Sequence, residues 1–353
     1  MQSIVSDSYA VHFKDKALEA LNRELRMGSY SMVFILVDEN THEYCLPRFM
    51  SEINGDYEYE IIEIESGEIN KTIETCVGVW EALSELGADR KSILINLGGG
   101  VLTDLGGFVA STFKRGIAFI NVPTTLLSMV DASVGGKTGV DLGSLKNQVG
   151  VINQPVMVLV IPDFLDTLEE RQLESGFAEM LKHGLIKDRQ YWDDLKMVST
   201  LSEMKDHILK SVEIKNEVVL IDPTEQGLRK ILNYGHTLGH AIESYFLASQ
   251  EKSTLLHGEA IAIGMITEGY LSHRLTGLSI IELDDIKSTF LKHYGKILFS
   301  NEDISKLLDL MKYDKKNSHG NINFVLLSKI GKAVIDIHIP SEIFEDAFAY
   351  YME

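Results

Sequence analysis

The sequence predicts two domains: an α/β domain with a parallel sheet over residues 1–165, and a mostly α-helical domain over residues 166–353. The chain has 353 residues, which exceeds the length of one typical domain. Short apolar runs alternate with a helical pattern in the first half, whereas apolar residues recur at spacings of three and four in the second.

Short apolar runs that end near Asp, Gly or Pro predict the strands of the first domain. These runs cover residues 31–38, 59–64, 91–97 and 117–122, and a further strand is expected over 149–162. An amphipathic helix is expected over 69–87. Because strands and helices alternate, we expect a parallel sheet with helices on both faces.

The second domain is expected to contain helices over residues 171–186, 201–220 and 227–246, and one extended pair over 322–337. The chain has no internal repeat and no long Pro- or Ser-rich linker. We therefore expect the domains to pack closely, with the active site in the cleft between them.

Composition excludes several classes of protein. Apolar residues make up 45% of the chain, enough for a folded core, and the net charge of −19 argues against nucleic acid or an anionic membrane as partner. Two cysteines, Cys45 and Cys76, predict buried thiols and no disulfide framework. With neither a signal-peptide pattern nor an apolar run long enough to span a membrane, we expect a soluble cytoplasmic protein.

A glycine-rich segment, GGGVLTDLGGF over 98–108, directly follows the apolar run 91–97. A strand, a glycine cluster and a helix start form a backbone cradle for a diphosphate, although Thr103 replaces the third glycine of the dinucleotide fingerprint. Asp38, Glu68 and Lys71 follow other predicted strands, where acidic groups suit ribose hydroxyls. The alternative is that these are surface charges on loops.

The stretch DASVGGKT, residues 131–138, nearly matches the phosphate-binding loop of nucleotide kinases and ATPases. Asp131 occupies the place of the first glycine, and its carboxylate would repel a nucleotide phosphate. We therefore reject a kinase loop, and we expect Lys137 to meet another anionic group.

Histidines and carboxylates in the second half indicate a metal site. Arg229, Asn233, His236, His240 and Glu243 follow one another at steps of four, three, four and three, which places them on one stripe of a helix. No glutamate adjoins His236, so the hydrolase pattern with its general base is excluded.

Two further segments could complete the metal shell. Glu179, Lys182 and His183 share one helical face, and His257 lies near Glu259. Two imidazoles and one carboxylate form a catalytic zinc set, but spacing does not choose two histidines among His183, His236, His240 and His257. A chain without any metal is the alternative.

Clustered cations in an acidic chain favour a substrate with several negative charges. These cations are Arg115, Lys137, Lys146, Lys182, Lys215, Arg229, Lys315 and Lys316.

Taken together, these motifs resemble the 3-dehydroquinate synthases. The matching segments cover nearly the whole chain in the family's order: GGGVLTDLGGFVASTFKRG, VPTTLLSMVDASVGGKTGVD, LKNQVG, SGFAEMLKHGLI, LNYGHTLGHAIE, LLHGEA and DKKNSHGNINFVLLSKIGKA. The resemblance implies an N-terminal NAD-binding domain, a helical C-terminal domain around one divalent metal (zinc or cobalt), and a homodimer in which Arg115 reaches the neighbouring subunit's site.

The resemblance also assigns residues. It implies that the metal ligands are Glu179, His236 and His257, with His240 as a contact to substrate phosphate. It implies that NAD is held by Asp38, Asn40, Glu68, Lys71, Gly99, Gly100, Val101, Asp104, Thr124, Thr125, Leu127, Asp131, Lys137, Lys146, Phe164, Thr167 and Leu168. It places Arg115, Asp131, Lys137, Lys146, Asn147, Lys182, Lys215, Arg229, Asn233 and His240 around the substrate, with Lys315 or Lys316 closing over it.

The implied reaction converts 3-deoxy-D-arabino-heptulosonate 7-phosphate to 3-dehydroquinate and phosphate, a step of aromatic amino acid biosynthesis. It proceeds by transient oxidation at C5 by NAD, phosphate elimination, re-reduction, ring opening and intramolecular aldol closure. The nearest alternatives are a cyclase for another sugar phosphate and a metal-dependent polyol dehydrogenase. A P-loop enzyme and a non-catalytic NAD-binding module are more distant ones.

Overall fold

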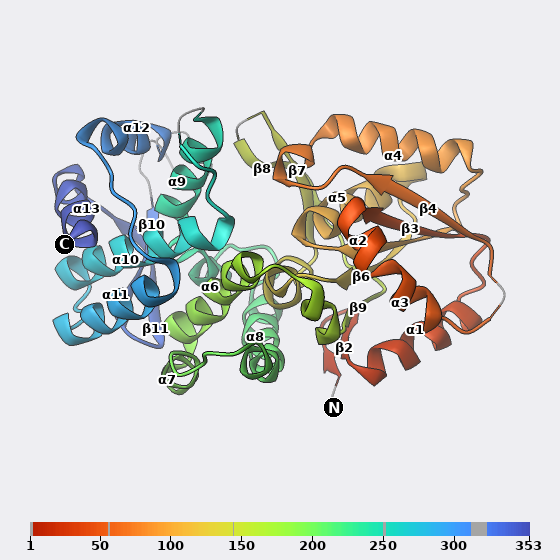
Figure 1. The fold of residues 1–353 in the computed structure, drawn as a ribbon, viewed down its shortest axis with the longest axis horizontal. Coiled ribbons are helices and arrows are strands. Elements are labelled where there is room, and N and C mark those ends of the chain that lie inside the picture. The colour runs from red at the N-terminus through yellow and green to blue at the C-terminus, as the bar shows by residue number, and fades with distance from the viewer. Residues whose placement is uncertain (1–2, 56, 144, 250–251, 312–322) are drawn as a thin grey trace. The chain divides into compact units, whose positions relative to one another are not determined.

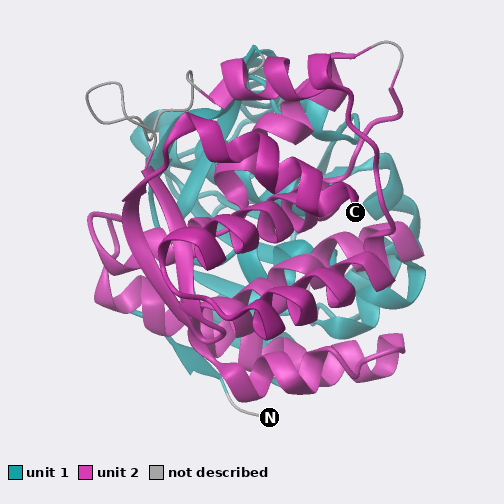
Figure 2. Cartoon of the chain, turned by 90° about the vertical axis from the view of Figure 1, so that its left-hand side faces the viewer, with its two compact units in different colours: residues 1–169 teal, residues 170–353 magenta. Residues whose placement is uncertain are grey.

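The computed structural model describes residues 3–55, 57–143, 145–249, 252–311 and 323–353. The chain forms two compact units, residues 1–169 and residues 170–353, which Figure 2 shows in different colours. The first unit contains a mostly parallel sheet and the second is mostly helical, so the predicted fold class is confirmed.

The main sheet of the first unit, within the described residues, has the strand order β1-β2-β9-β6-β5-β3-β4. Figure 1 labels β2, β9, β6, β3 and β4 of this sheet. All neighbouring strands are parallel except β1 and β2. The strands are β1 (Ile4–Val5), β2 (Ala10–Phe13), β3 (Val33–Asp38), β4 (Tyr59–Ile64), β5 (Ile93–Gly98), β6 (Ala118–Pro123) and β9 (Met157–Val160).

Both faces of this sheet are covered, as expected for parallel strands. Phe34 and Leu94 pack in a cluster with residues of two helices, α4 (Ile73–Glu85) and α5 (Gly100–Thr112). Ile35 and Ile95 point to the opposite face and are equally buried. The remaining helices of this unit are α1 (Asp15–Met27), which packs on β2 and β9, and α2 (Glu39–Tyr44) and α3 (Leu46–Ser51), which follow β3.

The strand predicted over 149–162 is wrong in one respect, because the segment belongs to two strands. Its start is the end of β8 (Leu145–Ile152), which forms an antiparallel hairpin with β7 (Lys137–Leu142). Its end is β9 in the main sheet. Pro155 lies between them and has no N–H to donate to a strand ladder, so one continuous strand is disfavoured.

The second unit is organised around α10 (His257–Leu275), most of whose side chains are buried. It contacts α6, α9, α11, α13 and β10. The other elements of this unit are α6 (Glu170–Lys187), α7 (Arg189–Leu195), α8 (Leu201–Ile221), α9 (His236–Ala248), α11 (Ile280–Tyr294), α12 (Asn301–Met311), α13 (Phe344–Met352) and the antiparallel pair β10 (Asn323–Lys329) and β11 (Lys332–His338).

The single helix predicted over 227–246 is also wrong. The segment forms a 3₁₀ helix, Leu228–Asn233, followed by a break and then α9. Gly235 makes the break with φ of 79°, a left-handed conformation that glycine adopts without strain. The expected stripe is therefore divided: His236, His240 and Glu243 share one face of α9, whereas Arg229 and Asn233 lie on the 3₁₀ helix.

Two expectations from composition are met in the structure. Cys45 and Cys76 are both buried free thiols. Among the described residues, no helix combines the length and the apolar character needed to cross a membrane.

Candidate metal centre and dinucleotide-binding edge

Three helices of the second unit bring two imidazoles and a carboxylate together. His236 Nε2 lies 3.4 Å and His257 Nε2 lies 3.6 Å from the same atom, Glu179 Oε1. Glu179 comes from α6, His236 from α9 and His257 from α10. His240 is near as well, since ligand atoms of the three histidines lie within 4.8 Å of one another.

Glycines allow the helices to approach closely enough for this convergence. A Cβ on Gly264 of α10 would lie 2.0 Å from the carbonyl oxygen of Gly235, and a Cβ on Gly258 would lie 2.0 Å from that of Ser175. Neither contact is possible for a larger residue. The backbones of α9 and α6 can therefore lie directly against α10, which brings His236 and Glu179 to His257.

Hydrogen bonds orient both imidazoles. His236 Nδ1 lies 3.0 Å from the carbonyl oxygen of Tyr234, an acceptor that requires Nδ1 to carry the proton. His257 Nδ1 lies 3.0 Å from Glu243 Oε2. In both residues the remaining nitrogen, Nε2, is the one directed to Glu179, and a partner of this kind is common behind metal-bound histidines.

The charges at this position also suit a divalent cation. Glu179 is fully buried and forms an ion pair with Lys182. Burial lowers the pKa of His257, but the Glu243 and Glu179 carboxylates outweigh burial and raise it to about 10. The cluster therefore attracts positive charge, and a metal ion would replace the proton because a histidine ligand must be neutral.

Two imidazoles and one carboxylate match the ligand set of catalytic zinc sites. The residues present thus fit the metal that the sequence led us to expect. His183, which the spacing left open, is buried on α6 and its Nδ1 lies 2.6 Å from Ser211 Oγ of α8.

Three cations of the second unit are buried: Lys182, Lys215 and Arg229 are at most 5% exposed. Arg229 Nη1 donates to the carbonyl oxygen of Pro223 at 2.7 Å. Asn233 on the same 3₁₀ helix donates to Glu225. Lys182 pairs with Glu179, and a group of buried cations of this kind suits an anionic ligand. Lys315 and Lys316 lie outside the described residues.

In the first unit, the predicted dinucleotide site lies where the strand order reverses. The chain passes from β3 outward to β4 and returns to β5 on the other side of β3. Ligands of open parallel sheets bind at such a point, beyond the carboxyl ends of the strands. Asp38 ends β3 there, and Gly99 follows β5.

Gly99 is also the residue that precedes α5, so the first N–H groups of that helix follow the glycine cluster. A Cβ on Gly99 would lie 3.1 Å from Thr125, and one on Gly100 would lie 3.3 Å from Ala132. The remaining predicted NAD contacts lie close to these strand ends in the sequence: Asn40 in α2, Val101 and Asp104 in α5, Thr124, Thr125 and Leu127 after β6, and Phe164, Thr167 and Leu168 after β9.

Several predicted cofactor and substrate residues form one charge cluster. Lys71 Nζ donates to Asp104 at 2.6 Å and to Asn147 at 2.8 Å, and Lys146 Nζ donates to Glu68 at 2.7 Å. Burial lowers the pKa of Lys71, but the Asp104 and Glu68 carboxylates outweigh it and raise the pKa above its usual value. Lys71 is therefore charged at neutral pH.

Asp141 belongs to this cluster although no sequence pattern selects it. Its carboxylate accepts the Asn147 N–H at 2.6 Å and lies 3.7 Å from Lys146 Nζ. Sequence patterns also did not select Glu225, the carbonyl of Tyr234, or Glu268, whose carboxylate accepts the Gly235 N–H at 2.7 Å, because the partners of these groups are set by tertiary contacts. Glu243 could be selected from the sequence, because it lies on the same helical stripe as His236 and His240.

The segment DASVGGKT does not form a phosphate-binding loop. Asp131 lies in a helical turn, Ser128–Ala132, and Lys137 begins β7 of the antiparallel hairpin. A P-loop requires a strand, a loop and then a helix that starts at the Lys-Ser/Thr pair. Rejecting the kinase loop is therefore correct.

Arg115 lies on the surface of the first unit with φ of 71°. It lines a shallow groove together with Phe119, Val151, Ile152 and Gln154. Val151 and Ile152 of β8 are exposed apolar residues.

Comparison with known proteins agrees with this geometry. Residues 61–175 match the family model described as 3-dehydroquinate synthase N-terminal, and residues 176–317 match the one described as 3-dehydroquinate synthase C-terminal. A 3-dehydroquinate synthase of Parabacteroides distasonis is 42% identical over 353 residues, which cover 99% of each chain.

Two solved structures share the fold. One is 2-epi-5-epi-valiolone synthase from Streptomyces hygroscopicus with NAD⁺ and Zn²⁺ bound, at a TM-score of 0.86 and 26% identity, covering 99% of this chain and 98% of that one. The other is 2-deoxy-scyllo-inosose synthase complexed with carbaglucose-6-phosphate, NAD⁺ and Co²⁺, at a TM-score of 0.84 and 26% identity, covering 99% of both chains. With its motifs, its fold and its convergent Glu179, His236 and His257 in agreement with matches over this length, the chain belongs to the 3-dehydroquinate synthase family.

Proposed function

We propose that this protein is a phosphate-eliminating lyase that converts 3-deoxy-D-arabino-heptulosonate 7-phosphate to 3-dehydroquinate. The observation that carries the proposal is the convergence of Glu179, His236 and His257 in a unit that also buries Lys182, Lys215 and Arg229. Family membership supports the same reaction. The substrate has a carboxylate and a phosphate, which explains buried cations in a chain of net charge −19.

Glu179, His236 and His257 would hold one divalent metal, zinc or cobalt, and the edge formed by Asp38, the Gly99 loop and Thr124 would hold NAD. When bound, NAD would supply reversible hydride transfer at C5, and the metal would supply the positive charge that lowers the pKa of the hydroxyl to be oxidised. No net NADH is formed in a complete turnover.

The chain's own residues bind and orient a flexible molecule through several steps. Arg229 presents a planar fork of donors that suits a carboxylate or a phosphate, and Lys182 and Lys215 supply compact charges. Asn233 and His240 would donate to substrate oxygens. Holding the reacting groups in alignment contributes roughly 7–11 kcal/mol in favourable cases. The other predicted substrate contacts are Asp131, Lys137, Lys146, Asn147, and Lys315 or Lys316.

We further propose a cytoplasmic homodimer. Arg115 is exposed beside the apolar side chains of Val151 and Ile152, which suits a residue that contacts a second copy of the chain.

The test is to follow phosphate release from the heptulosonate phosphate together with NADH absorbance, before and after chelation of the metal. We expect phosphate release that stops on chelation, returns with zinc or cobalt, and is accompanied by no accumulation of NADH. Accumulating NADH without phosphate release would instead identify a polyol dehydrogenase.

A cyclase for another sugar phosphate is the second candidate, favoured by the structural likeness to 2-epi-5-epi-valiolone synthase and 2-deoxy-scyllo-inosose synthase. The two candidates are separated by supplying sugar phosphates that lack the carboxylate. Turnover of these in preference to the heptulosonate would contradict the proposed substrate.

A further inference from the structure

One face of α6 contacts three successive residues at the start of α10. Arg171, Ser175 and Glu179 are spaced by four and therefore share a face of α6. Arg171 Nε donates to Glu259 Oε1 at 2.7 Å, and Ser175 Oγ accepts the Gly258 N–H at 2.9 Å. Glu179 Oε1 lies 3.6 Å from His257 Nε2. Successive turns of α6, from Arg171 to Glu179, therefore contact consecutive residues of α10 in reverse order, from Glu259 to His257.

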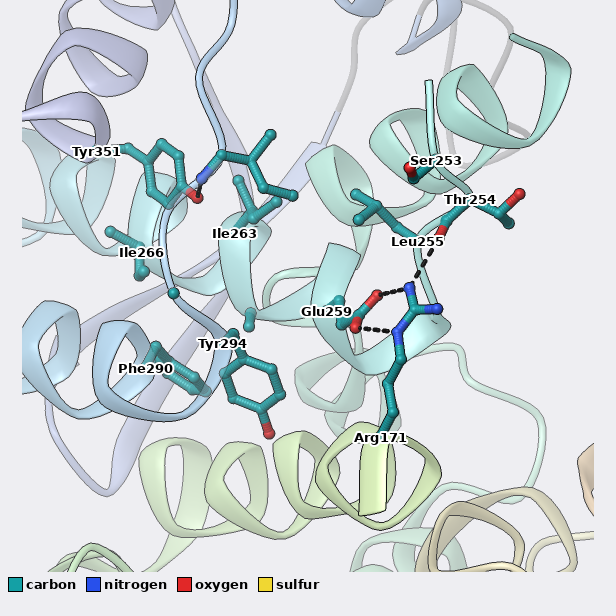
Figure 3. Close-up of a pocket in the computed structure, with 13 residues that line it drawn as sticks. Arg171, Ser253, Thr254, Leu255, Glu259, Ile263, Ile266, Phe290, Tyr294 and Tyr351 are labelled. Atoms are coloured by element: carbon teal, nitrogen blue, oxygen red, sulfur yellow. Dashed lines mark hydrogen bonds and ion pairs between the residues drawn. The ribbon is translucent and has the colours of Figure 1, made fainter. Parts of the chain in front are cut away.

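The Arg171–Glu259 pair is bidentate and extends beyond the helix. A second nitrogen of Arg171, Nη2, donates to Glu259 Oε2 at 2.8 Å and to the carbonyl oxygen of Thr254 at 2.7 Å (Figure 3). Glu259 Oε2 also accepts the Leu256 N–H at 2.7 Å. The guanidinium therefore connects α6 to the chain on both sides of His257, through Thr254 before it and Glu259 after it.

The same ion pair forms part of the wall of a cavity. Arg171, Thr254 and Glu259 line one side of it, and Ile263, Phe290 and Tyr351 line the other (Figure 3). The start of α10 is thus held from the α6 side by Arg171 and Ser175, and from α9 by Glu243, whose carboxylate lies 3.0 Å from His257 Nδ1.

We propose that Arg171 is a positioning residue for the metal ligand His257 and acts through Glu259. The proposal rests on the metal site of the proposed function and adds a determinant of its affinity. The side chain of Arg171 is 54% exposed, and an exposed ion pair contributes little to folding stability. Its removal should therefore alter metal affinity more than stability.

The experiment measures the zinc dissociation constant of the chelator-stripped full chain, by competition with a chromophoric chelator. We expect Arg171→Ala and Glu259→Ala each to weaken zinc binding by about tenfold, as for other residues that orient a metal ligand. The double variant should bind zinc about as weakly as the single ones, because both changes break the same contact. Arg171→Lys, which keeps the charge and loses the fork, should lie between wild type and Arg171→Ala.

Arg189→Ala is the matched control. Arg189 is a similarly exposed arginine of the same unit that pairs with Asp193 on α7. Its zinc affinity should stay within about twofold of wild type, and the melting temperature of every zinc-saturated variant should stay within about 4 °C of wild type.

Wild-type zinc affinity in Arg171→Ala and Glu259→Ala would overturn the proposal while leaving the metal site itself intact. An equal loss in Arg189→Ala would also overturn it, because the effect would then be general. A wild-type chain that binds no zinc or cobalt would overturn the metal site and the positioning role together.

Discussion

The carboxylate of Glu243 lies 3.0 Å from His257 Nδ1, on the side of the imidazole away from Glu179. Glu243 is on α9 and His257 begins α10, so the contact also joins the two helices that supply His236 and His257. A carboxylate in this position fixes the orientation of the ring and increases the basicity of the other nitrogen.

We therefore expect Glu243→Ala to weaken zinc binding by about 10- to 100-fold, because residues behind a metal ligand have effects of this size. Glu243→Gln retains an oxygen that accepts from Nδ1 and should lose less. The measurement is zinc affinity by chelator competition. Equal affinities for wild type and Glu243→Ala would show that Glu243 does not orient His257.

Substitution of single histidines distinguishes the possible ligand sets. We expect His257→Ala to lose both zinc and turnover, whereas His240→Ala should keep stoichiometric zinc and lose substrate affinity, seen as a raised KM. Zinc content by atomic emission and steady-state kinetics give the two readouts. If His240→Ala instead loses zinc, the metal is bound by the histidine pair spaced four apart on α9.

Arg229→Ala should lower kcat/KM by about 10- to 100-fold, since a charge-assisted hydrogen bond contributes about 1.5–3 kcal/mol. Arg229→Lys should recover only part of this because it lacks the planar fork. Zinc affinity should be unchanged in both variants. Unaltered kinetics in Arg229→Ala would remove Arg229 from the set of anion-binding residues.

Gly264 is predicted to be essential for the approach of α9 to α10. A Cβ there would meet a backbone carbonyl at 2.0 Å, and overpacking of this kind costs about 1–3 kcal/mol or more. We expect Gly264→Ala to unfold at lower urea concentration and to bind zinc weakly, because His236 would move away from His257.

Gly269→Ala on the same helix is the control for Gly264→Ala. The nearest neighbours of its Cβ would be side-chain atoms of Leu283, Tyr234 and Ile286, the closest at 3.2 Å, so no backbone contact at 2.0 Å forms as at Gly264. This variant should match wild type in zinc affinity. Equal behaviour of the two variants would contradict the importance of the close approach at Gly264.

Asp303 predicts a pH dependence of stability that is independent of the metal. Burial raises the pKa of its carboxyl, but hydrogen bonds from Tyr245, the Ser300 N–H and Lys252 outweigh burial and hold the pKa below its usual 3.8. A lowered pKa stabilises the fold above the unfolded-state value, and this contribution is lost as the pH falls below about 4.

Asp303→Asn should therefore lower the free energy of unfolding by about 1–3 kcal/mol between pH 5 and pH 8, the cost of weakening buried hydrogen bonds. The difference from wild type should shrink below about pH 4. Urea unfolding at several pH values measures both. A difference that does not change with pH would mean that the carboxylate charge contributes nothing.

Local patterns in the sequence were sufficient for β3, β4, β5 and β6, because a buried parallel strand is a short apolar run and its end is marked by glycine, aspartate or proline. The short strands β1 and β2 were not predicted. The run 91–97 followed by Gly98 and Gly99 predicted β5 and the start of α5. The same reasoning joined β8 and β9 into one strand, since apolar content alone does not report which partner each half pairs with.

The candidate metal ligands, too, were only partly predictable from local sequence patterns. Spacing placed His236, His240 and Glu243 on one face of a helix, and only resemblance to a family selected Glu179 and His257 from elements far away in the sequence. The tertiary structure brought Glu179, His236 and His257 together. Gly235, Gly258 and Gly264 allow this because their missing side chains permit backbone contact. The sequence by itself determined the fold class, the family and the candidate ligands, because these depend on periodicity and motif. Tertiary packing alone decided which carboxylates contact the predicted site residues. Glu243 contacts His257 and Asp141 contacts Lys146, because segments distant in the sequence pack together.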